Sequence, residues 1–203
     1  MNNIYDKSNI DCTSCQVCAS VCPLKAIKIM LSSKGFYKPV IDESVCTSCG
    51  LCKKSCIKYS NNSFIAPKNI TCFSAVNRNQ DILEKSSSGG IISAIYEYAL
   101  ENGYKCLGVV YNSSFHRAET IIIESKADID IARTSKYLPV FSEKTTSILL
   151  KSNDKWCIIA TPCTLYGIKK SLEVSNKDLN NYIFVDFFCH GTPSQLLWNQ
   201  QLA

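Results

Sequence analysis

A run of four cysteines occurs twice near the start of the 203-residue sequence, and this duplication constrains the fold more than any other feature. The first run reads C-T-S-C-x-x-C-x-x-x-C, and the second has the same letters and spacing 34 positions later. The eight residues are Cys12, Cys15, Cys18, Cys22, Cys46, Cys49, Cys52 and Cys56. A repeat of this size predicts two similar halves packed about a pseudo-two-fold axis.

The spacing within each run fits a 4Fe–4S cluster. Three cysteines spaced C-x-x-C-x-x-C hold one cube from a single tight loop, and the fourth thiolate comes from elsewhere. Residues 1 to about 60 resemble bacterial two-cluster ferredoxins, in which the last cysteine of each run serves the other cluster. This pattern implies one-electron transfer. The implied ligand sets are Cys12, Cys15, Cys18 and Cys56 for one cluster, and Cys46, Cys49, Cys52 and Cys22 for the second.

Zinc is the alternative metal. Zinc sites favour two separated C-x-x-C pairs, and a third cysteine two residues further, twice over, has no role in them. Pro23 follows Cys22, as the ferredoxin pattern asks, whereas Ile57 stands after Cys56, where proline is more usual. The regular spacing therefore favours two clusters over zinc.

Composition supports metal binding in a reducing compartment. The first 11 residues are polar and do not form the apolar stretch of a signal peptide, so we expect a cytosolic protein. Because cytosolic thiols stay reduced, its thirteen cysteines indicate metal ligands rather than disulfides. No apolar run approaches the roughly 18 residues that span a bilayer, so we expect a cytoplasmic protein without a membrane span. The formal charge is +5, but two clusters would lower it to roughly +1. We therefore expect no binding to nucleic acid. The expected partners are a redox partner protein and a small-molecule substrate.

The expected elements divide the chain into three parts. Residues 1–60 are the two-cluster ferredoxin-type domain, in which 26–30 and 37–41 form a hairpin around Ser32, Ser33 and Gly35. Residues 61–70 are polar and turn-rich and are predicted to be a linker. Residues 71–203 are predicted to be an α/β domain of the flavin-binding type. We expect this domain to be incomplete, because the sequence ends within a predicted helix.

Apolar strands alternate with helices in this third part. Strands are expected at 72–76, 106–111, 120–124, 156–160 and 182–187, and helices at 90–102, 128–133, 143–151, 164–172 and from about 194. One face of the helix at 90–102 is expected to carry Ile91, Ile92, Ile95, Tyr98 and Ala99. Such alternation favours a parallel or mixed sheet covered on both faces. The predicted fold class is an α+β ferredoxin-like two-cluster module followed by a partial α/β domain.

Four short segments of the α/β part carry candidate chemistry. K-S-S-S-G-G at 85–90 opens a helix, where free backbone N–H groups favour an anion, although a serine cap with a glycine loop is also a common helix start. T-S-K-Y at 134–137 has no clear meaning by itself. T-P-C at 161–163 and C-H-G-T-P-S at 189–194 each follow an apolar strand, where ligand sites of open sheets lie. Their cysteines are expected to line one crevice or to be small buried residues.

Together and in this order, the four segments resemble the coenzyme F-420 hydrogenase/dehydrogenase beta-subunit family. The matching pieces span residues 85–194 and include G-I-K at 167–169. The resemblance implies an FAD-binding α/β domain, and a ferredoxin module in front fits many members. Some members oxidise or reduce the deazaflavin coenzyme, and others act on different substrates.

The resemblance also implies roles for individual residues. The implied flavin-contacting residues are Ser86, Ser87, Ser88, Gly89, Gly90, Lys136, Thr161 and Pro162. Lys136 would neutralise a reduced flavin, and the loop N–H groups would contact phosphate or flavin oxygens. Cys163 and Cys189 would be two ligands of a third 4Fe–4S cluster, whose other ligands lie in a downstream C-x-x-C absent from this sequence. His190 is the candidate proton donor, with a structural histidine as the alternative.

The remaining candidates have simpler interpretations. Cys72, Cys106 and Cys157 lie in apolar segments and are expected to act as small hydrophobic residues. His116 is expected in a solvated loop. The lysines at positions 53, 54 and 58 form a basic cluster that would dock an acidic redox partner or would simply be a solvated face.

These patterns together predict an iron–sulfur flavoprotein oxidoreductase. Two 4Fe–4S clusters would pass single electrons, and FAD would exchange electrons with an organic substrate such as a deazaflavin. The first alternative is a ferredoxin-like electron carrier whose α/β domain binds no flavin. The second is a truncated product without a stable second domain.

Overall fold

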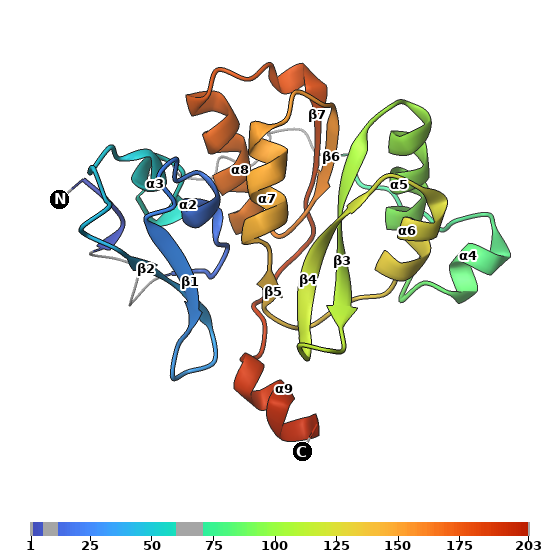
Figure 1. Ribbon diagram of the computed structural model, residues 1–203. Coiled ribbons are helices and arrows are strands. Elements are labelled where there is room, and N and C mark those ends of the chain that lie inside the picture. Colours follow the sequence, from blue (N-terminus) through green and yellow to red (C-terminus); the bar gives the residue numbers. More distant parts are fainter. Residues whose placement is uncertain (1, 6–11, 60–70, 203) are drawn as a thin grey trace.

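The computed structural model describes residues 2–5, 12–59 and 71–202. The linker expected at 61–70 lies outside these residues. Figure 1 shows a small cysteine-rich module beside a larger part built on a twisted sheet. Helices lie on both sides of that sheet, and the last helix lies below both parts in this view.

The cysteine-rich module consists of one hairpin and two short helices. Strands β1 (Ile27–Leu31) and β2 (Tyr37–Ile41) pair antiparallel, with Ile27 opposite Ile41. Helices α2 (Val17–Ser20) and α3 (Leu51–Lys54) each follow the second cysteine of a run, and the 3-10 helix η1 (Ile57–Tyr59) ends the module. The hairpin that the turn residues predicted is confirmed.

The sequence repeat is also a repeat of backbone conformation. Ser14 and its counterpart Ser48 have φ of 61° and 55°, and Gln16 and its counterpart Gly50 have φ of 63° and 79°. Helix α2 begins directly after Gln16, and α3 begins directly after Gly50. The two cysteine loops therefore share one strained conformation, although only one of the two helix-preceding residues is a glycine.

The larger part contains a five-stranded mixed sheet with strand order β5-β4-β3-β6-β7. Its strands are β3 (Lys105–Asn112), β4 (Arg117–Ile123), β5 (Val140–Phe141), β6 (Trp156–Ile159) and β7 (Tyr182–Val185). Strand β3 is antiparallel to β4 and parallel to β6, and β6 is parallel to β7. The predicted mixed sheet is confirmed.

Helices cover both faces of this sheet. The helices are α4 (Gln80–Glu84), α5 (Ile91–Glu101), α6 (Lys126–Ala132), α7 (Glu143–Lys151), α8 (Pro162–Val174), η2 (Leu179–Asn181) and α9 (Gln195–Leu202). Helices α7 and α8 lie between the sheet and the cysteine-rich module, and α5 and α6 lie on the opposite face (Figure 1). None of the helices described here has the length and apolar character needed to cross a membrane.

Two expectations for the larger part are wrong. Residues 72–76 form no strand, and Phe73 is 85% exposed, because β-propensity yields a strand only where a neighbouring strand supplies hydrogen bonds. On α5, the buried residues are Ser93, Tyr96 and Ala99, whereas Ile91 and Tyr98 are exposed. Tyr96 decides this rotation, since its hydroxyl donates a buried hydrogen bond of 2.9 Å to the carbonyl of Leu107 on β3.

The two parts share one hydrophobic core. Val17 on α2 is buried in the same cluster as Trp156 of β6 and Ile168 of α8. A Cβ atom at Gly167 would lie 3.0 Å from Val17 Cγ2 and 3.1 Å from the carbonyl oxygen of Ser55. Gly167 therefore allows α8 to approach the cysteine-rich module closely.

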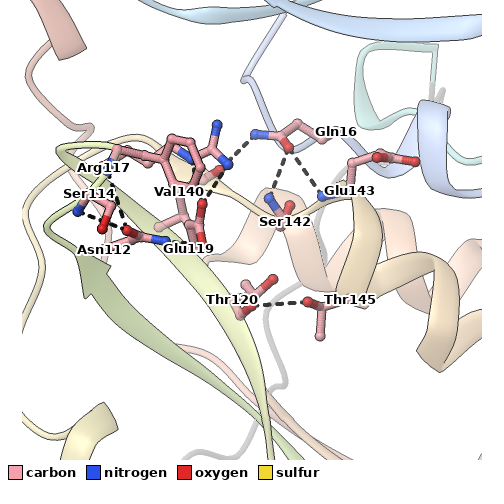
Figure 2. Close-up of polar contacts among 11 residues, drawn as sticks. Gln16, Asn112, Ser114, Arg117, Glu119, Thr120, Val140, Ser142, Glu143 and Thr145 are labelled. Atoms are coloured by element: carbon pink, nitrogen blue, oxygen red, sulfur yellow. Dashed lines mark hydrogen bonds and ion pairs between the residues drawn. The ribbon is translucent and has the colours of Figure 1, made fainter.

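A buried glutamine ties the first cysteine loop to α7. Gln16 Oε1 accepts hydrogen bonds from the backbone N–H groups of Ser142 at 2.9 Å and Glu143 at 3.2 Å. Its Nε2 donates to the carbonyl of Val140 at 2.7 Å (Figure 2). The N–H groups at a helix start lack intrahelical partners, so Gln16 caps α7 from another part of the chain.

The last helix contacts the tips of both hairpins. The backbone N–H of Gln195 donates to the carbonyl of Gly35, in the β1–β2 turn, at 2.8 Å. The Gln195 side chain donates to the carbonyl of His116, in the β3–β4 turn, at 2.7 Å. Trp198 adds a hydrogen bond to the Tyr111 hydroxyl and an edge-to-face ring contact with it. Helix α9 therefore bridges the two parts.

We predict that Gln16→Ala lowers the melting temperature by roughly 5–10 °C, because it leaves buried backbone groups near α7 unpaired, at about 1–3 kcal/mol each. Hydrogen exchange at residues 142–146 should become faster. Gln80→Ala is the control, since the Gln80 side chain is exposed and, in the part of the chain that the structure describes, bonds only to Glu84 on its own helix. Equal melting temperatures for the two variants would refute the capping role of Gln16.

We predict that Gly167→Val destabilises the packing of α8 on the module by about 1–3 kcal/mol through overpacking. Valine is a better helix former than glycine, so intrinsic propensity alone would have the opposite effect. Lys169→Val, at an exposed position of the same helix, is the control. Urea denaturation should show a lower midpoint for Gly167→Val than for the control, and the reverse order would contradict the packing argument.

Candidate functional site

The structure gathers four cysteines around a first cavity. This cavity is partly open to solvent. Its cysteines are Cys12, Cys15, Cys18 and Cys56. Apolar and aromatic side chains complete the lining, among them Ile4, Ile29 and Tyr37.

A second cavity is lined by the other four cysteines of the repeat. These are Cys22, Cys46, Cys49 and Cys52. Leu24, Ile27 and Ile41 supply apolar lining. The last cysteine of each run therefore lines the cavity of the other run.

Backbone and side-chain N–H groups point at several of these sulfur atoms. The N–H of Ala26 donates to Cys22 Sγ at 3.3 Å, and that of Ser14 donates to Cys12 Sγ at 3.4 Å. The Asn3 side chain donates to Cys46 Sγ at 3.7 Å. Such N–H donors stabilise negative charge on thiolate sulfur.

Burial distinguishes the two loops. Burial raises the pKa of Cys15 to about 12 and that of Cys18 well above the usual thiol value, and nearby cysteines add to both shifts. Burial also raises the pKa values of Cys52 and Cys56. Cys49, the counterpart of Cys15, is exposed. Thiolates in the buried positions need a compensating metal charge, as metal coordination provides.

The K-S-S-S-G-G loop and the T-S-K-Y segment lie side by side. The N–H of Ser135 donates to Ser87 Oγ at 2.9 Å, and Ser86 Oγ donates to the carbonyl of Ile82. Gly90, with φ of 69°, precedes α5. Within the described chain, the backbone N–H groups of Ser88 and Gly89 donate to no protein acceptor. This loop can therefore offer N–H groups to an anion.

Lys136 lies in the same region, but its ammonium group is already engaged. It donates to the backbone carbonyls of Ala132 and Thr134, at 2.9 and 3.1 Å, and also to that of Arg133. Burial lowers the pKa of Lys136. The side chain thus completes the carboxyl end of α6, where a cation is favoured.

Thr161, Pro162 and Cys163 form the start of α8, directly beyond β6. Thr161 Oγ1 lies 3.4 Å from Cys163 Sγ and 3.1 Å from Thr164 Oγ1. Cys163 is near enough to Cys15 to raise its pKa. The start of α8 therefore lies beside the first cavity.

Cys189 and His190 lie on an exposed segment without regular structure between β7 and α9. No hydrogen bond or ion pair joins Cys189 to Cys163 among the residues that the structure describes. Over these same residues, no group of three or more His, Cys, Asp or Glu side chains is placed to hold a single metal ion.

Sequence reasoning missed Gln16 and the contacts around Arg117. Arg117 lies over the rings of Phe115 and Phe141, at 4.9 and 4.3 Å. It also donates to Glu119 (Figure 2). Tyr37 meets Phe141 edge-to-face at 5.5 Å. One feature of the sequence could have indicated the special role of Gln16, since the equivalent position of the second cysteine run, Gly50, is a glycine.

Two sequence families match the chain. Residues 11–59 match the 4Fe-4S dicluster domain. Residues 72–145 match the family described as coenzyme F420 hydrogenase/dehydrogenase, beta subunit N-term. The second match includes the loop at 85–90 and Lys136, and it ends within α7.

Two proteins of Methanocaldococcus jannaschii are similar in sequence. An uncharacterized protein is 23% identical over 208 residues, which cover 95% of this chain and 56% of that protein. Coenzyme F420-dependent sulfite reductase is 22% identical over 174 residues, which cover 84% of this chain and 26% of that enzyme. The chain thus spans about half the length of the first relative and about a quarter of the second.

A solved structure shares the fold. It is the F420-reducing [NiFe] hydrogenase complex from Methanosarcina barkeri, studied by xenon derivatization. One of its chains has a TM-score of 0.50 and 24% sequence identity, over 59% of this chain and 44% of that one. The protein therefore joins a region that matches the 4Fe-4S dicluster domain to one that matches the N-terminal domain of the coenzyme F420 hydrogenase/dehydrogenase beta subunit.

Proposed function

We propose that the chain is an iron–sulfur oxidoreductase module that holds one 4Fe–4S cluster in each cysteine-lined cavity. The observation that carries this proposal is the division of eight cysteines into two sets of four, each around its own cavity. Each set contains three cysteines of one run and the last cysteine of the other, which is the ligand pattern of two-cluster ferredoxins.

The cavities suit a cluster better than a zinc ion. Each cavity takes three cysteines from one C-x-x-C-x-x-C loop and a fourth from the other loop, whereas structural zinc sites favour two separated C-x-x-C pairs. The apolar lining residues Ile29 and Ile41 would exclude water, and N–H donors such as that of Ala26 would hold the thiolates. Both effects set reduction potentials.

A flavin is the second cofactor that we propose, with the loop at 85–90 as its phosphate site. The N–H groups of Ser88 and Gly89 at the start of α5 support this role. Lys136 does not support direct contact with a flavin, because its ammonium group is bonded to three backbone carbonyls. When bound, the clusters would supply one-electron transfer and the flavin would supply exchange of electron pairs.

The substrate class follows from the relatives alone. The named relative and the solved complex are both described by their use of coenzyme F420. We propose that this chain works with a small organic redox substrate of the same kind, a deazaflavin or a compound of similar chemistry. The exposed His190 is the candidate proton donor in the segment beyond β7.

A second function deserves its own test, namely an electron carrier that binds no flavin. The internal bonding of Lys136 favours it, because the cation expected to face a reduced flavin instead caps α6. The exposed, unpaired position of Cys189 fits the same interpretation. Flavin content separates the two functions directly.

We predict about eight iron and eight sulfide per chain after anaerobic purification, because each proposed cluster contributes four of each. Stoichiometric FAD in the same sample would support the oxidoreductase, and eight iron without flavin would support the carrier. Zinc in place of iron would overturn both proposals.

We predict that cysteine variants fall into pairs by cavity rather than by run. Cys22→Ala and Cys49→Ala should leave the same residual electron paramagnetic resonance signal after reduction, because both residues line the second cavity. Cys56→Ala and Cys15→Ala should share a different residual signal, because both line the first.

The exposed Cys72 lies in neither cavity lining and provides the control, so Cys72→Ala should keep both signals. If Cys22→Ala instead resembled Cys15→Ala, the exchange of the last cysteines between runs would be wrong.

A further inference from the structure

The internal repeat places two equivalent loops on the module. The helices of both loops contact α8, where Ser171 Oγ donates to Ser55 Oγ at 2.9 Å, but only α2 of these two helices also packs extensively on α7 in the described chain. In the first loop, Val17, Ala19 and Ser20 are all buried, and α2 packs on α7 and α8. Ser20 Oγ donates to the carbonyl of Glu143 at 2.9 Å. This side of the module is therefore an internal interface.

The second loop carries different side chains on the same backbone. The counterparts of Ala19 and Ser20 are Lys53 and Lys54, and the counterpart of Cys15 is the exposed Cys49. Lys54 is exposed, and Lys53 is half-buried with its ammonium 5.0 Å from the ring centre of Tyr59. At the two positions where the first loop has small buried residues in the internal interface, the second loop therefore has lysines.

Other residues around the second cavity extend this surface. Leu24 lines the cavity and is 46% exposed, and the exposed Lys25 follows it directly. We define the outer surface as Leu24, Lys25, Cys49, Lys53 and Lys54. An apolar centre with a charged rim is the usual composition of a transient protein interface.

Lysines outnumber carboxylates in residues 12–59 of the cysteine-rich module. Residues 12–59 contain seven lysines but only two carboxylates, Asp42 and Glu43. Asp42 accepts hydrogen bonds from the backbone and hydroxyl of Ser44, at 3.1 and 2.6 Å. Within the described chain, neither Lys53 nor Lys54 forms an ion pair with a carboxylate. Their charges are therefore available to a partner.

We propose that the outer surface docks an acidic protein that carries single electrons, bringing the redox centre of that partner next to Cys49. This proposal rests on the proposed function, because Cys49 matters to such a partner only if the second cavity holds a cluster. It gives the two cavities different tasks. The second cavity faces the external partner, and the first faces the α/β part, where Gly167 of α8 packs against Ser55 in the lining of that cavity.

The test is binding of a small, strongly acidic ferredoxin to the anaerobically purified full chain, measured by titration calorimetry. Attraction between exposed charges is screened by salt, so affinity should fall steeply as ionic strength rises. The double variant Lys53→Glu/Lys54→Glu should bind at least about tenfold more weakly, and Lys53→Arg/Lys54→Arg should bind nearly as well as the original chain.

The matched control is Lys126→Glu/Lys151→Glu, which changes net charge equally at two exposed lysines outside the cysteine-rich module. It should change affinity by no more than about twofold. Equal loss of binding in both charge-reversal variants, or affinity that does not respond to salt, would overturn the docking proposal.

Iron and sulfide content separates failure of this proposal from failure of the proposed function. Cluster-loaded protein that shows no effect of Lys53→Glu/Lys54→Glu would refute only the docking surface. Protein without iron and sulfide would refute the proposed function itself. A small uncharged reductant should reduce the original chain and all three variants at the same rate. If Lys53→Glu/Lys54→Glu alone were reduced more slowly, its defect would lie in the cluster rather than in docking, and the docking proposal would be refuted.

Discussion

The capping of α7 by Gln16 is the interaction on which the arrangement of the molecule depends. One side-chain amide satisfies two backbone N–H groups and one carbonyl that belong to a different part of the chain. Gln16 lies between two cysteines of the first cavity, so the loop that would hold a cluster and the start of α7 cannot move independently. An unpaired buried backbone group costs more than a hydrogen bond contributes, which makes this contact hard to replace.

The repeat shows how one backbone can serve two purposes. Both cysteine loops have left-handed residues at equivalent positions before a short helix, so that the two loops curve in the same way. The side chains on the outer side of each loop differ, because the two loops have different surroundings. Gln16 and Val17 of the first loop enter the shared core, whereas the second loop has Gly50, covered by Asn2, and two lysines. The two loops are therefore alike in the cysteines that line their cavities and differ in the side chains that meet the surroundings.

The parts of the structure that sequence reasoning anticipated are those encoded locally. Cysteine spacing predicted two sets of four, and the lining of the two cavities has the same division. Strand β2 and helix α7 begin and end where apolar patterning placed them. The misses depend on distant contacts. The hydroxyl of Tyr96 sets the rotation of α5 by reaching β3, and Gln16 bonds to residues more than 120 positions away. Lys136 is a different case, because its ammonium group bonds to carbonyls only two to four residues back. Residue type alone does not specify such partners.

Helix α9 has a mechanical consequence. It is bonded to the tip of each hairpin, while Gln16 and Gly167 join the same two parts at another place. Two bodies joined at a single contact can rotate about it in any direction, whereas contacts at separated places restrict that rotation. The distance between the first cysteine loop and the start of α8 is then set by a rigid frame. Since electron tunnelling decays exponentially with distance, such a frame would keep the transfer rate constant while the surface loops fluctuate.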